Sequence, residues 1–240
     1  MPAAVKPSAA SRRPAAVRKT APRAAKPAVV KAARSNARGT LRREALLTVA
    51  QEVFLERGYA GTSVEDVVSR VGGSKASLYS YFGSKEGLFA DMIHTRCAEF
   101  LKAVAVPKTV EGNLESTLVA FGLRFFKVFS HRERVQVTRA IIAEATRFPE
   151  LAALLYQSGP RHIRMQLATF FADCHAKGLM HTTDPELSAI FFIELVKGHC
   201  QFRSLLGLTP IAGSRSQAEF VAAAVQVFLR GHAQPQGAKS

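Results

Sequence analysis

Residues 75–82 form a predicted short helix whose outward side chains are small, hydroxylated or cationic. Leu78 and Phe82 are four positions apart, so they share one face and should point into a core. The side chains left facing outward are Lys75, Ala76, Ser77, Tyr79, Ser80 and Tyr81. Hydroxyl and ammonium groups donate hydrogen bonds to phosphates and base edges, and small side chains let a helix enter the major groove of DNA. The chemistry indicated is therefore DNA binding.

The placement of charge around this helix also favours a phosphate ligand. Residues 68–84 contain no acidic residue, and three cations lie within or beside them: Arg70, Lys75 and Lys85. Backbone N–H groups at helix starts bind phosphates, and three such starts are expected here, after Thr62, Ser74 and Ser84. Residues 41–96 contain seven cations and seven acids, so the position of the charges carries the signal rather than their sum.

Two further helices are expected to hold this short helix in place. Apolar residues at helical spacing predict a first helix over about 40–57, which Gly58 ends. Thr62 and Glu65 have the spacing of a capping box, which predicts the start of a second helix. A four-residue turn, 71–74, separates that helix from the short one, and this arrangement is a helix-turn-helix.

The rest of the chain is also predicted to be helical. Ser84 caps a fourth helix, and patterns of punctuation and apolar spacing predict six more, over about 113–130, 133–147, 149–157, 160–177, 185–206 and 216–231. Strand signals are missing. The expected fold is all-α, with a helix-turn-helix domain over 40–100, a helical ligand-binding and dimerisation domain over 101–233, and a disordered tail over 234–240.

The N-terminal segment differs sharply in composition from the rest. The chain has 240 residues and a net charge of +15, and its first 40 residues hold ten cations and no acid. The remaining 200 residues therefore carry only +5. Residues 1–38 contain five prolines and no aromatic residue, Leu or Ile. They cannot bury enough apolar surface to offset their ordering entropy, so we expect residues 1–39 to be a disordered basic arm.

Other kinds of chemistry find little support in the sequence. Nucleotide-binding, metalloprotease and nucleophile-elbow motifs are missing, so neither catalysis nor a cofactor is expected. Cys97, Cys174 and Cys200 form no CxxC pair, and their spacing to histidines fits no standard zinc site. No apolar run is long enough to span a membrane, and no secretory signal is present. These features predict a cytoplasmic protein associated with the nucleoid, without a metal site.

The segment "TSVEDVVSRVGGSKASLYSYFGSKEGLF" resembles the DNA-binding domain of TetR-type transcriptional regulators. The stretch "EATRFPELAALLYQSGP", followed by Gly178-Leu179 and Asp184-Pro185, is similar to the AefR-like C-terminal domain of the same family. Two positions depart from the family pattern: Gly73 stands where an apolar residue, often Val, is usual, and Ala76 stands where Gly is common. Because glycine buries no side chain, Gly73 is expected to loosen the turn.

The resemblance implies a homodimeric repressor that a small apolar or amphipathic ligand releases from its DNA operator. It implies that residues 74–82 read bases, and we expect Lys75, Ala76, Ser77 and Ser80 to decide the base preference, with Ser74 at the start of the helix also at the DNA. It also implies phosphate contacts from Tyr79, Tyr81 and Lys85, and from Thr62 or Ser63 at the start of the second helix. The helices over 185–206 and 216–231 have apolar faces wide enough for a core and for a second subunit.

Aromatic residues of the C-terminal region are candidates for lining a ligand cavity: Phe121, Phe125, Tyr156, Phe170 and Phe191. Plain core packing explains the same helical spacing, so both interpretations stand. Arg124, Arg139, His162 and Glu194 are candidate polar anchors, or else residues of a solvated face.

Two other functions fit part of the sequence. A nucleoid-associated protein would bind DNA through its basic arm and need no ligand. A helical ligand-binding or interaction protein could keep the fold without binding DNA, in which case the short helix merely has a solvated face. Salt titrations on a defined operator and on random DNA separate the repressor from the nucleoid-associated protein, and a loss of all DNA binding would support the ligand-binding or interaction protein.

Deletion of residues 1–38 should weaken binding to random DNA at low salt and leave the preferred sequence unchanged. Each phosphate contact contributes a slope of roughly −0.9 in log affinity against log salt, so three cations per subunit would steepen a dimer's slope by roughly five. The measurement is a salt titration of both proteins on random DNA. Equal slopes would mean that the arm has no role in binding.

Overall fold

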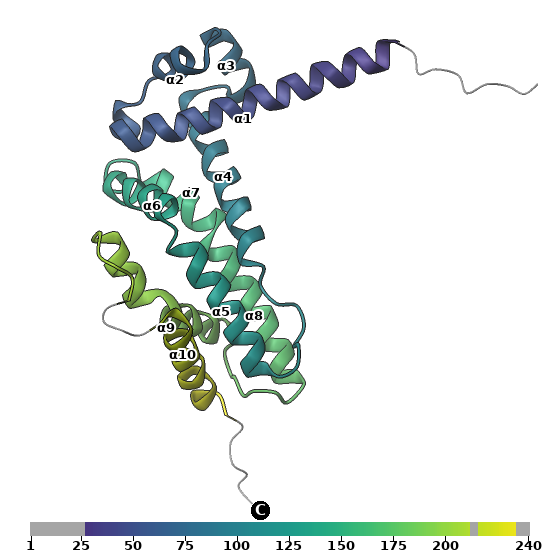
Figure 1. Ribbon diagram of the computed structural model, residues 1–240, viewed down its shortest axis with the longest axis vertical. Coiled ribbons are helices and arrows are strands. Elements are labelled where there is room, and N and C mark those ends of the chain that lie inside the picture. Colours follow the sequence, from purple (N-terminus) through teal and green to yellow (C-terminus); the bar gives the residue numbers. More distant parts are fainter. Residues whose placement is uncertain (1–26, 212–215, 234–240) are drawn as a thin grey trace, which may run out of the picture. The chain divides into compact units, whose positions relative to one another are not determined.

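The computed structural model describes residues 27–211 and 216–233, with side chains from residue 38 onward. Within these ranges the chain is all-α, with ten helices and no strand, which confirms the predicted fold class (Figure 1). The helices are α1 (Pro27–Gly61), α2 (Val64–Val71), α3 (Lys75–Phe82), α4 (Lys85–Val104), α5 (Leu114–Phe129), α6 (Arg132–Glu144), α7 (Pro149–Ser158), α8 (Pro160–Ala176), α9 (Pro185–Leu205) and α10 (Gln217–Gly231).

Most predicted helix ends are confirmed by their capping contacts. The hydroxyls of Ser74 and Ser84 accept hydrogen bonds from the N–H groups three residues ahead, at 3.2 and 3.1 Å. Asp184 caps α9, with Pro185 as its first residue, and Ser216 forms the predicted capping box at the start of α10. Gly58 interrupts the helical backbone with a φ of 70°, as expected for a helix end.

The start of α1 is a correction to the sequence analysis. The helix was expected from about residue 40, after a disordered segment, but it begins at Pro27. All five prolines of the N-terminal segment lie at or before position 27, and the residues that follow include the good helix formers Ala, Lys and Arg. Pro27 itself suits the first position of a helix. The rest of the predicted arm, residues 1–26, and the predicted tail, 234–240, lie outside the described residues. A deletion that spares α1 would therefore stop at residue 26.

The chain divides into two units, 1–41 and a larger one from Arg42 onward, and α1 runs through both. The expected limit between the helix-turn-helix domain and the C-terminal domain, near residue 100, lies within α4. The larger unit contains two hydrophobic cores. The first is formed by the end of α1, by α2, α3 and most of α4, together with Ile141 of α6 and Leu151 of α7.

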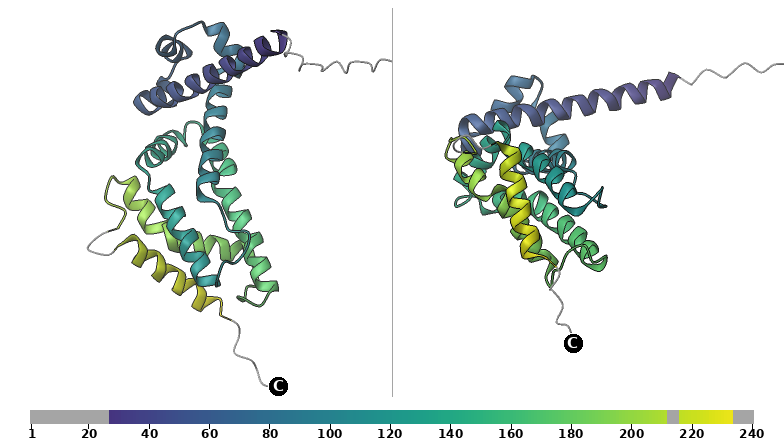
Figure 2. Two further views of the ribbon diagram at one scale, coloured as in Figure 1. Left: turned by 45° about the vertical axis from the view of Figure 1, so that its right-hand side comes forward. Right: turned by 60° about the horizontal axis from the view of Figure 1, so that its bottom comes forward.

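The second core is a bundle of α5, α8, α9 and α10. α8 packs along α9, and α10 packs on both α5 and α9. Helix α4 leads from the first core to the second, as the views of Figures 1 and 2 agree, and its last residue, Val104, is buried in the bundle. Among the described residues, no helix is both long and apolar enough to cross a membrane.

The turn between α2 and α3 is held by an arginine from α1. Gly72 and Gly73 have φ values of 78° and 105°, a region in which β-branched residues are strained. The Arg42 guanidinium donates a hydrogen bond to the Gly72 carbonyl and occupies the place where a side chain at residue 73 would begin. The turn is therefore not loosened by the missing side chain, because Arg42 fills the space.

Gly73→Val should destabilise the protein, although valine is common at this position in the family that the sequence resembles. Backbone strain at a positive φ costs about 1–3 kcal/mol, and the Arg42 guanidinium would have to leave the Gly72 carbonyl to make room for the new side chain. The measurement is the free energy of unfolding by urea denaturation. Gly72→Val is the matched control, since a Cβ at residue 72 meets nothing within 4 Å and that variant carries the strain alone. A Gly73→Val protein as stable as the unmodified chain would contradict this account.

Candidate nucleic-acid interface and ligand cavity

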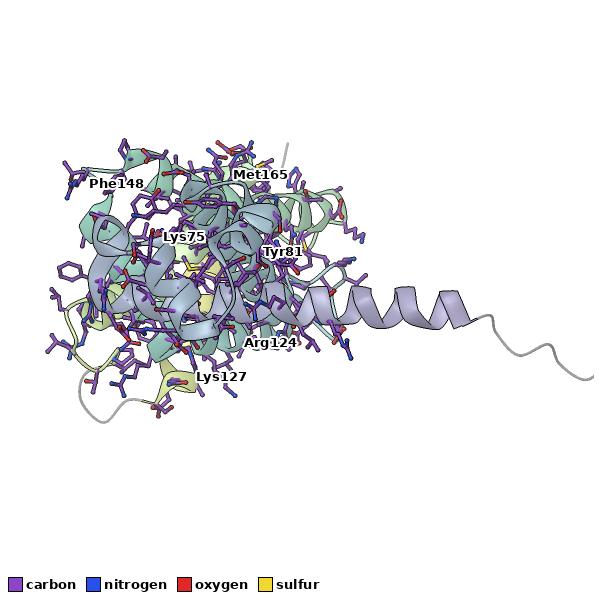
Figure 3. The ribbon with its side chains drawn as sticks, turned by 90° about the horizontal axis from the view of Figure 1, so that it is seen from above. Lys75, Tyr81, Arg124, Lys127, Phe148 and Met165 are labelled. Atoms are coloured by element: carbon purple, nitrogen blue, oxygen red, sulfur yellow. The ribbon has the colours of Figure 1, made fainter. Side chains whose placement is uncertain are left out.

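Helix α3 has the predicted length and the predicted orientation. Leu78 is fully buried and Phe82 nearly so, which confirms that these two side chains anchor the helix. Tyr79 and Tyr81 are 46% and 37% exposed. Lys75, Ala76 and Ser80 are exposed as well, while Ser77 is half-buried. The outward face thus carries the small, hydroxylated and cationic groups that the sequence placed there, and Lys75 and Tyr81 are labelled in Figure 3.

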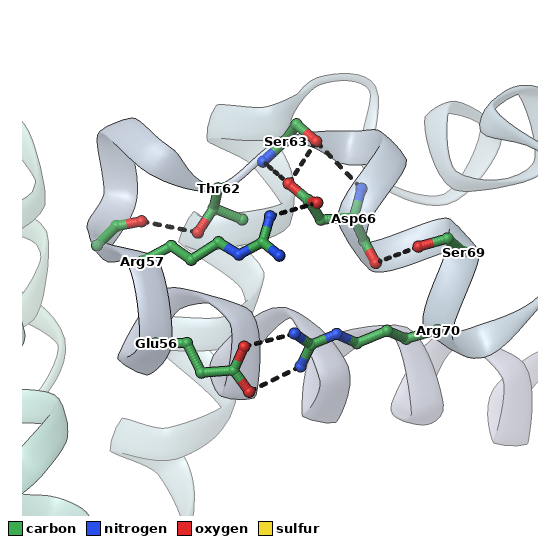
Figure 4. A network of polar contacts seen from close by, with 8 residues as sticks. Glu56, Arg57, Thr62, Ser63, Asp66, Ser69 and Arg70 are labelled. Carbon is green, nitrogen blue, oxygen red and sulfur yellow. Dashed lines mark hydrogen bonds and ion pairs between the residues drawn. The ribbon is translucent and has the colours of Figure 1, made fainter.

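The start of α2 differs from the prediction by one residue. Ser63, not Thr62, caps the helix, and Asp66, not Glu65, completes the capping box. Ser63 and Asp66 are joined by three hydrogen bonds of 2.6–3.1 Å (Figure 4). Thr62 is buried, and its hydroxyl donates to the Gly58 carbonyl at 2.7 Å, so it closes the end of α1. Of the two residues predicted as alternatives for a phosphate contact, Thr62 is thus engaged within the protein, whereas Ser63 keeps a half-buried place on the surface.

Two of the three predicted cations already have carboxylate partners. Arg70 makes a two-pronged ion pair with Glu56 of α1, and Lys75 pairs with Glu65 of α2. A third pair, Arg57 with Asp66 at 2.6 Å, also ties α1 to α2 (Figure 4). Hydrogen bonds from Arg70 and Lys75 lower the pKa of Glu56 and Glu65 respectively. DNA would have to compete for these cations, so the face is less positive than the sequence suggested.

Lys85, the third cation, packs against an aromatic ring. Its ammonium nitrogen lies 4.5 Å from the centre of the Tyr59 ring, a cation–π contact. Burial lowers the pKa of Lys85, and nearby Glu86 and Glu144 oppose that shift. Tyr59 is itself clamped edge-on between Phe89 and Phe148, with ring centres 4.7 Å apart on both sides. A phosphate contact would therefore draw Lys85 away from this ring.

A cavity of about 400 Å³ lies where α4, α5 and α6 meet α7, α8 and α9. That volume is within the range of small-molecule sites. Its apolar wall includes Phe100, Val128, Phe129, Val137 and Leu155. Its ionisable side chains are Arg96, Glu99, Lys127, His131, Glu133 and Arg134, with the Cys97 thiol beside them. The single contribution from α1 is Gln51, a buried polar side chain.

The five predicted ligand-binding residues do not line this cavity. Phe121, Phe125 and Phe170 are buried in the core of the bundle. Tyr156 and Phe191 are 45% and 50% exposed. Aromatic residues at helical spacing are mostly core residues, so their pattern predicts the core of the bundle and not the lining of the cavity. Gln51, which does line the cavity, was missed because a polar residue beside the stripe position Ala50 is ordinary in an amphipathic helix.

The candidate polar anchors have partners elsewhere. Arg124 donates to the Val104 and Ala105 carbonyls, which closes the end of α4, and it is labelled in Figure 3. Arg139 donates to the Ser204 carbonyl at 3.1 Å, and His162 contacts the Gln157 carbonyl at 2.8 Å. Glu194 pairs with Lys197 one helical turn away. Each of these side chains secures a helix and lies outside the cavity lining.

The three cysteines lie in buried positions that are typical of unreactive thiols. All three are buried, and burial raises the pKa of each thiol, to about 11 for Cys97. A thiol with a raised pKa forms little of the reactive thiolate. In the part of the chain that the structure describes, no group of three or more His, Cys, Asp or Glu side chains is arranged to hold a metal ion.

Known protein families match both regions described above. The family of bacterial regulatory proteins of the tetR type matches residues 46–92, which contain α2 and α3. The AefR-like transcriptional repressor C-terminal domain matches residues 116–234, which contain most of α5 and all of α6 to α10. The two matches fall on the helix-turn-helix and on the bundle respectively.

Individual relatives are bacterial regulators of transcription. The repressor AcnR of Corynebacterium diphtheriae is 32% identical over 77 residues, which cover 32% of this chain and 40% of AcnR. The activator FasR of Mycolicibacterium smegmatis is 30% identical over 90 residues, which cover 38% of this chain and 41% of FasR. Among solved structures, the flavonoid-responsive regulator FrrA is 33% identical, with a TM-score of 0.74 over 82% of this chain and 100% of that one. The chain therefore belongs to the TetR family of transcriptional regulators and carries an AefR-like C-terminal domain.

Proposed function

We propose that this regulator is a homodimeric repressor that leaves its DNA operator when a small ligand fills the cavity. The observation that carries the proposal is helix α3, which is anchored by Leu78 and Phe82 and turns only small, hydroxylated or cationic groups outward. Such a helix can lie in a major groove with its side chains against base edges. The names of AcnR as a repressor and of FrrA as a ligand-responsive regulator support the same function.

Within this proposal, the residues of the interface have two roles. Side chains at the start and outer face of α3 read bases: Ser74, Lys75, Ala76, Ser77 and Ser80. Tyr79, Tyr81, Lys85 and Ser63 contact phosphates and fix the register of the helix. The Ser80 hydroxyl donates to the Ser77 carbonyl at 2.7 Å, so it is best placed to accept a hydrogen bond from a base.

The proposed dimer forms through α9 and α10. Leu187, Ile190, Phe191 and Leu195 of α9 are 36–50% exposed, and Val227 of α10 is 58% exposed. Phe191, Leu195 and Val227 border one shallow hollow with Glu194 and His232. A continuous apolar stripe of this kind on two adjacent helices is typical of a subunit interface. The same helices were expected from the sequence to form a four-helix contact with their symmetry mates.

The cavity favours a ligand-responsive regulator over a ligand-independent nucleoid protein. It has the volume of a small-molecule site, and its wall combines aromatic and aliphatic side chains with a few charged groups. The similar protein FrrA is named for its response to flavonoids, which are aromatic molecules. We infer an aromatic or amphipathic ligand for this chain.

Mapping of the protein's binding sites across its genome should yield a near-palindrome with half-sites centred about 10 base pairs, or ~34 Å, apart. The spacing follows because a symmetric dimer places two copies of α3 in successive major grooves.

Phe191→Glu should give a monomer and lose at least about tenfold in affinity for this site, since the two subunits that bind the half-sites would no longer be linked. Met165→Glu, on the exposed surface of α8, is the control. Asymmetric sites bound by a monomer would contradict the proposal.

Glu65→Gln should raise the affinity for DNA by about two- to fivefold, the range expected for an exposed ion pair. The reason is that Lys75 now pairs with Glu65 and must leave it to reach DNA. The measurement is a DNA titration at two salt concentrations, with Glu115→Gln of the bundle as the control. A fall in affinity would mean that the ion pair positions Lys75 and does not compete with DNA.

A further inference from the structure

Among the described residues around the cavity, some charged side chains have close ion-pair or hydrogen-bond partners and others do not. Glu99 pairs with Arg96 at 3.1 Å, and Glu133 accepts a hydrogen bond from Gln51 at 2.5 Å. Arg134 differs from these groups. In the described ranges it has no carboxylate within salt-bridge distance, and its only hydrogen bond is a long one, 3.5 Å, to the Arg96 carbonyl.

The surroundings of Arg134 take its charge partly out of water. Its guanidinium lies 5.4 Å from the centre of the Phe100 ring, which also lines the cavity. Burial lowers the pKa of Arg134, and the nearby carboxylates of Glu99 and Glu133 oppose that shift without forming a salt bridge with it. A half-buried cation with no carboxylate in direct contact is only partly compensated, and an anion that formed a salt bridge with Arg134 would complete that compensation. With Arg96 and Lys127, the cavity has three permanent cations against two carboxylates, both of which already accept hydrogen bonds.

A buried glutamine joins this charged wall to the DNA-binding domain. Gln51 belongs to α1, beside the core positions Ala50 and Val53. Its amide nitrogen donates to Glu133 of α6, and its amide oxygen accepts from the Nε of Arg96 on α4. Because a buried amide that loses its partners is destabilising, these two bonds fix α1 to the cavity wall. Arg96 is thus shared between Gln51 and the cavity.

We propose that the cavity takes an anionic aromatic ligand, whose acidic group pairs with Arg134 and draws Arg96 away from Gln51. This inference rests on the proposed function and names the ligand class and the contact that passes its binding to α1. A carboxylate, sulfonate or phenolate can accept two parallel hydrogen bonds from a guanidinium. The aromatic part would lie against Phe100, Phe129 and the aliphatic side chains beside them.

The switch follows from the loss of one hydrogen bond at a buried position. When Arg96 turns to the ligand, the Gln51 amide oxygen loses its hydrogen-bond donor. The position of α1 that is compatible with DNA binding then becomes less stable than a shifted position of α1 in which this hydrogen bond is not needed. A ligand shifts an equilibrium only through its different affinity for two states, and the Arg96 contact supplies that difference. By reciprocity, DNA would weaken binding of the ligand by the same factor.

The first test uses two fluorescent probes that differ only in their acidic group: anilinonaphthalene sulfonate and the uncharged N-phenylnaphthylamine. Arg134→Gln should weaken sulfonate binding about ten- to hundredfold, the range for a charged hydrogen-bonded contact, and leave the uncharged probe unaffected. Arg134→Lys should restore part of the loss. Arg132→Gln is the control, because Arg132 is an exposed neighbour on α6 that does not line the cavity.

Unchanged affinity for the uncharged probe also shows that the variant keeps its fold. The proposal is overturned if Arg134→Gln and Arg132→Gln bind the sulfonate equally well. It is also overturned if both probes lose affinity alike. No DNA is present in this experiment, so its failure is distinct from a failure of the proposed repressor function.

The second test concerns the contact with α1. Binding of the sulfonate probe should speed hydrogen exchange in the peptide covering residues 42–61 of the unmodified protein. Gln51→Met removes both hydrogen bonds with a side chain of similar length, so the probe should still bind but no longer change exchange in that peptide. An undiminished response in Gln51→Met would overturn the role of Gln51, and no response in the unmodified protein would overturn the switch.

Discussion

Helix α4 must satisfy two hydrophobic cores at once, and the placement of the other elements of the larger unit depends on this. Its first half buries Leu88, Phe89, Met92 and Ile93 against the helix-turn-helix, and its last residue, Val104, is buried in the C-terminal bundle. Arg124 of α5 closes its end by donating to the Val104 and Ala105 carbonyls. Because protein cores are close-packed, α4 cannot shift in one core without disturbing the other. A single helix thus links the helix-turn-helix to the helices that surround the cavity.

Several charged groups of the helix-turn-helix are paired with each other. Arg57 of α1 pairs with Asp66 of α2, and Arg70 of α2 pairs with Glu56 of α1, so these ion pairs connect the two helices in the absence of DNA. Exposed ion pairs contribute little to stability, so a phosphate can replace a carboxylate partner without great loss. The neutral sum of charges over residues 41–96 is consistent with this exchange. Affinity for DNA would then depend on how many of these ion pairs DNA opens.

Much of the fold could be predicted from the sequence because its signals are local. Capping residues and glycines mark helix ends within a turn, and the spacing of Leu78 and Phe82 gave the buried face of α3. The prediction failed where two neighbouring residues could both cap a helix: Thr62 and Ser63 differ only in what the end of α1 offers them. The cavity could not be predicted, since Gln51, Arg96 and Glu133 come together from α1, α4 and α6 through tertiary packing alone.

Helix α6 connects the cavity to α1 through hydrogen bonds. It contacts the end of α1 at two places, through Glu133 with Gln51 and through Glu144 with the N–H of Tyr59 at 3.2 Å. The Glu144 carboxylate lies so close to Gly58 that a side chain there would collide with it. Both contacts are hydrogen bonds between a carboxylate of α6 and a group of α1, and losing such a bond costs more than repacking apolar side chains of the cavity lining. If a ligand fills the cavity as proposed, a shift of α6 would therefore act on these two contacts with α1. The two carboxylates, rather than the aromatic core of the bundle, would then connect the cavity to the helix-turn-helix.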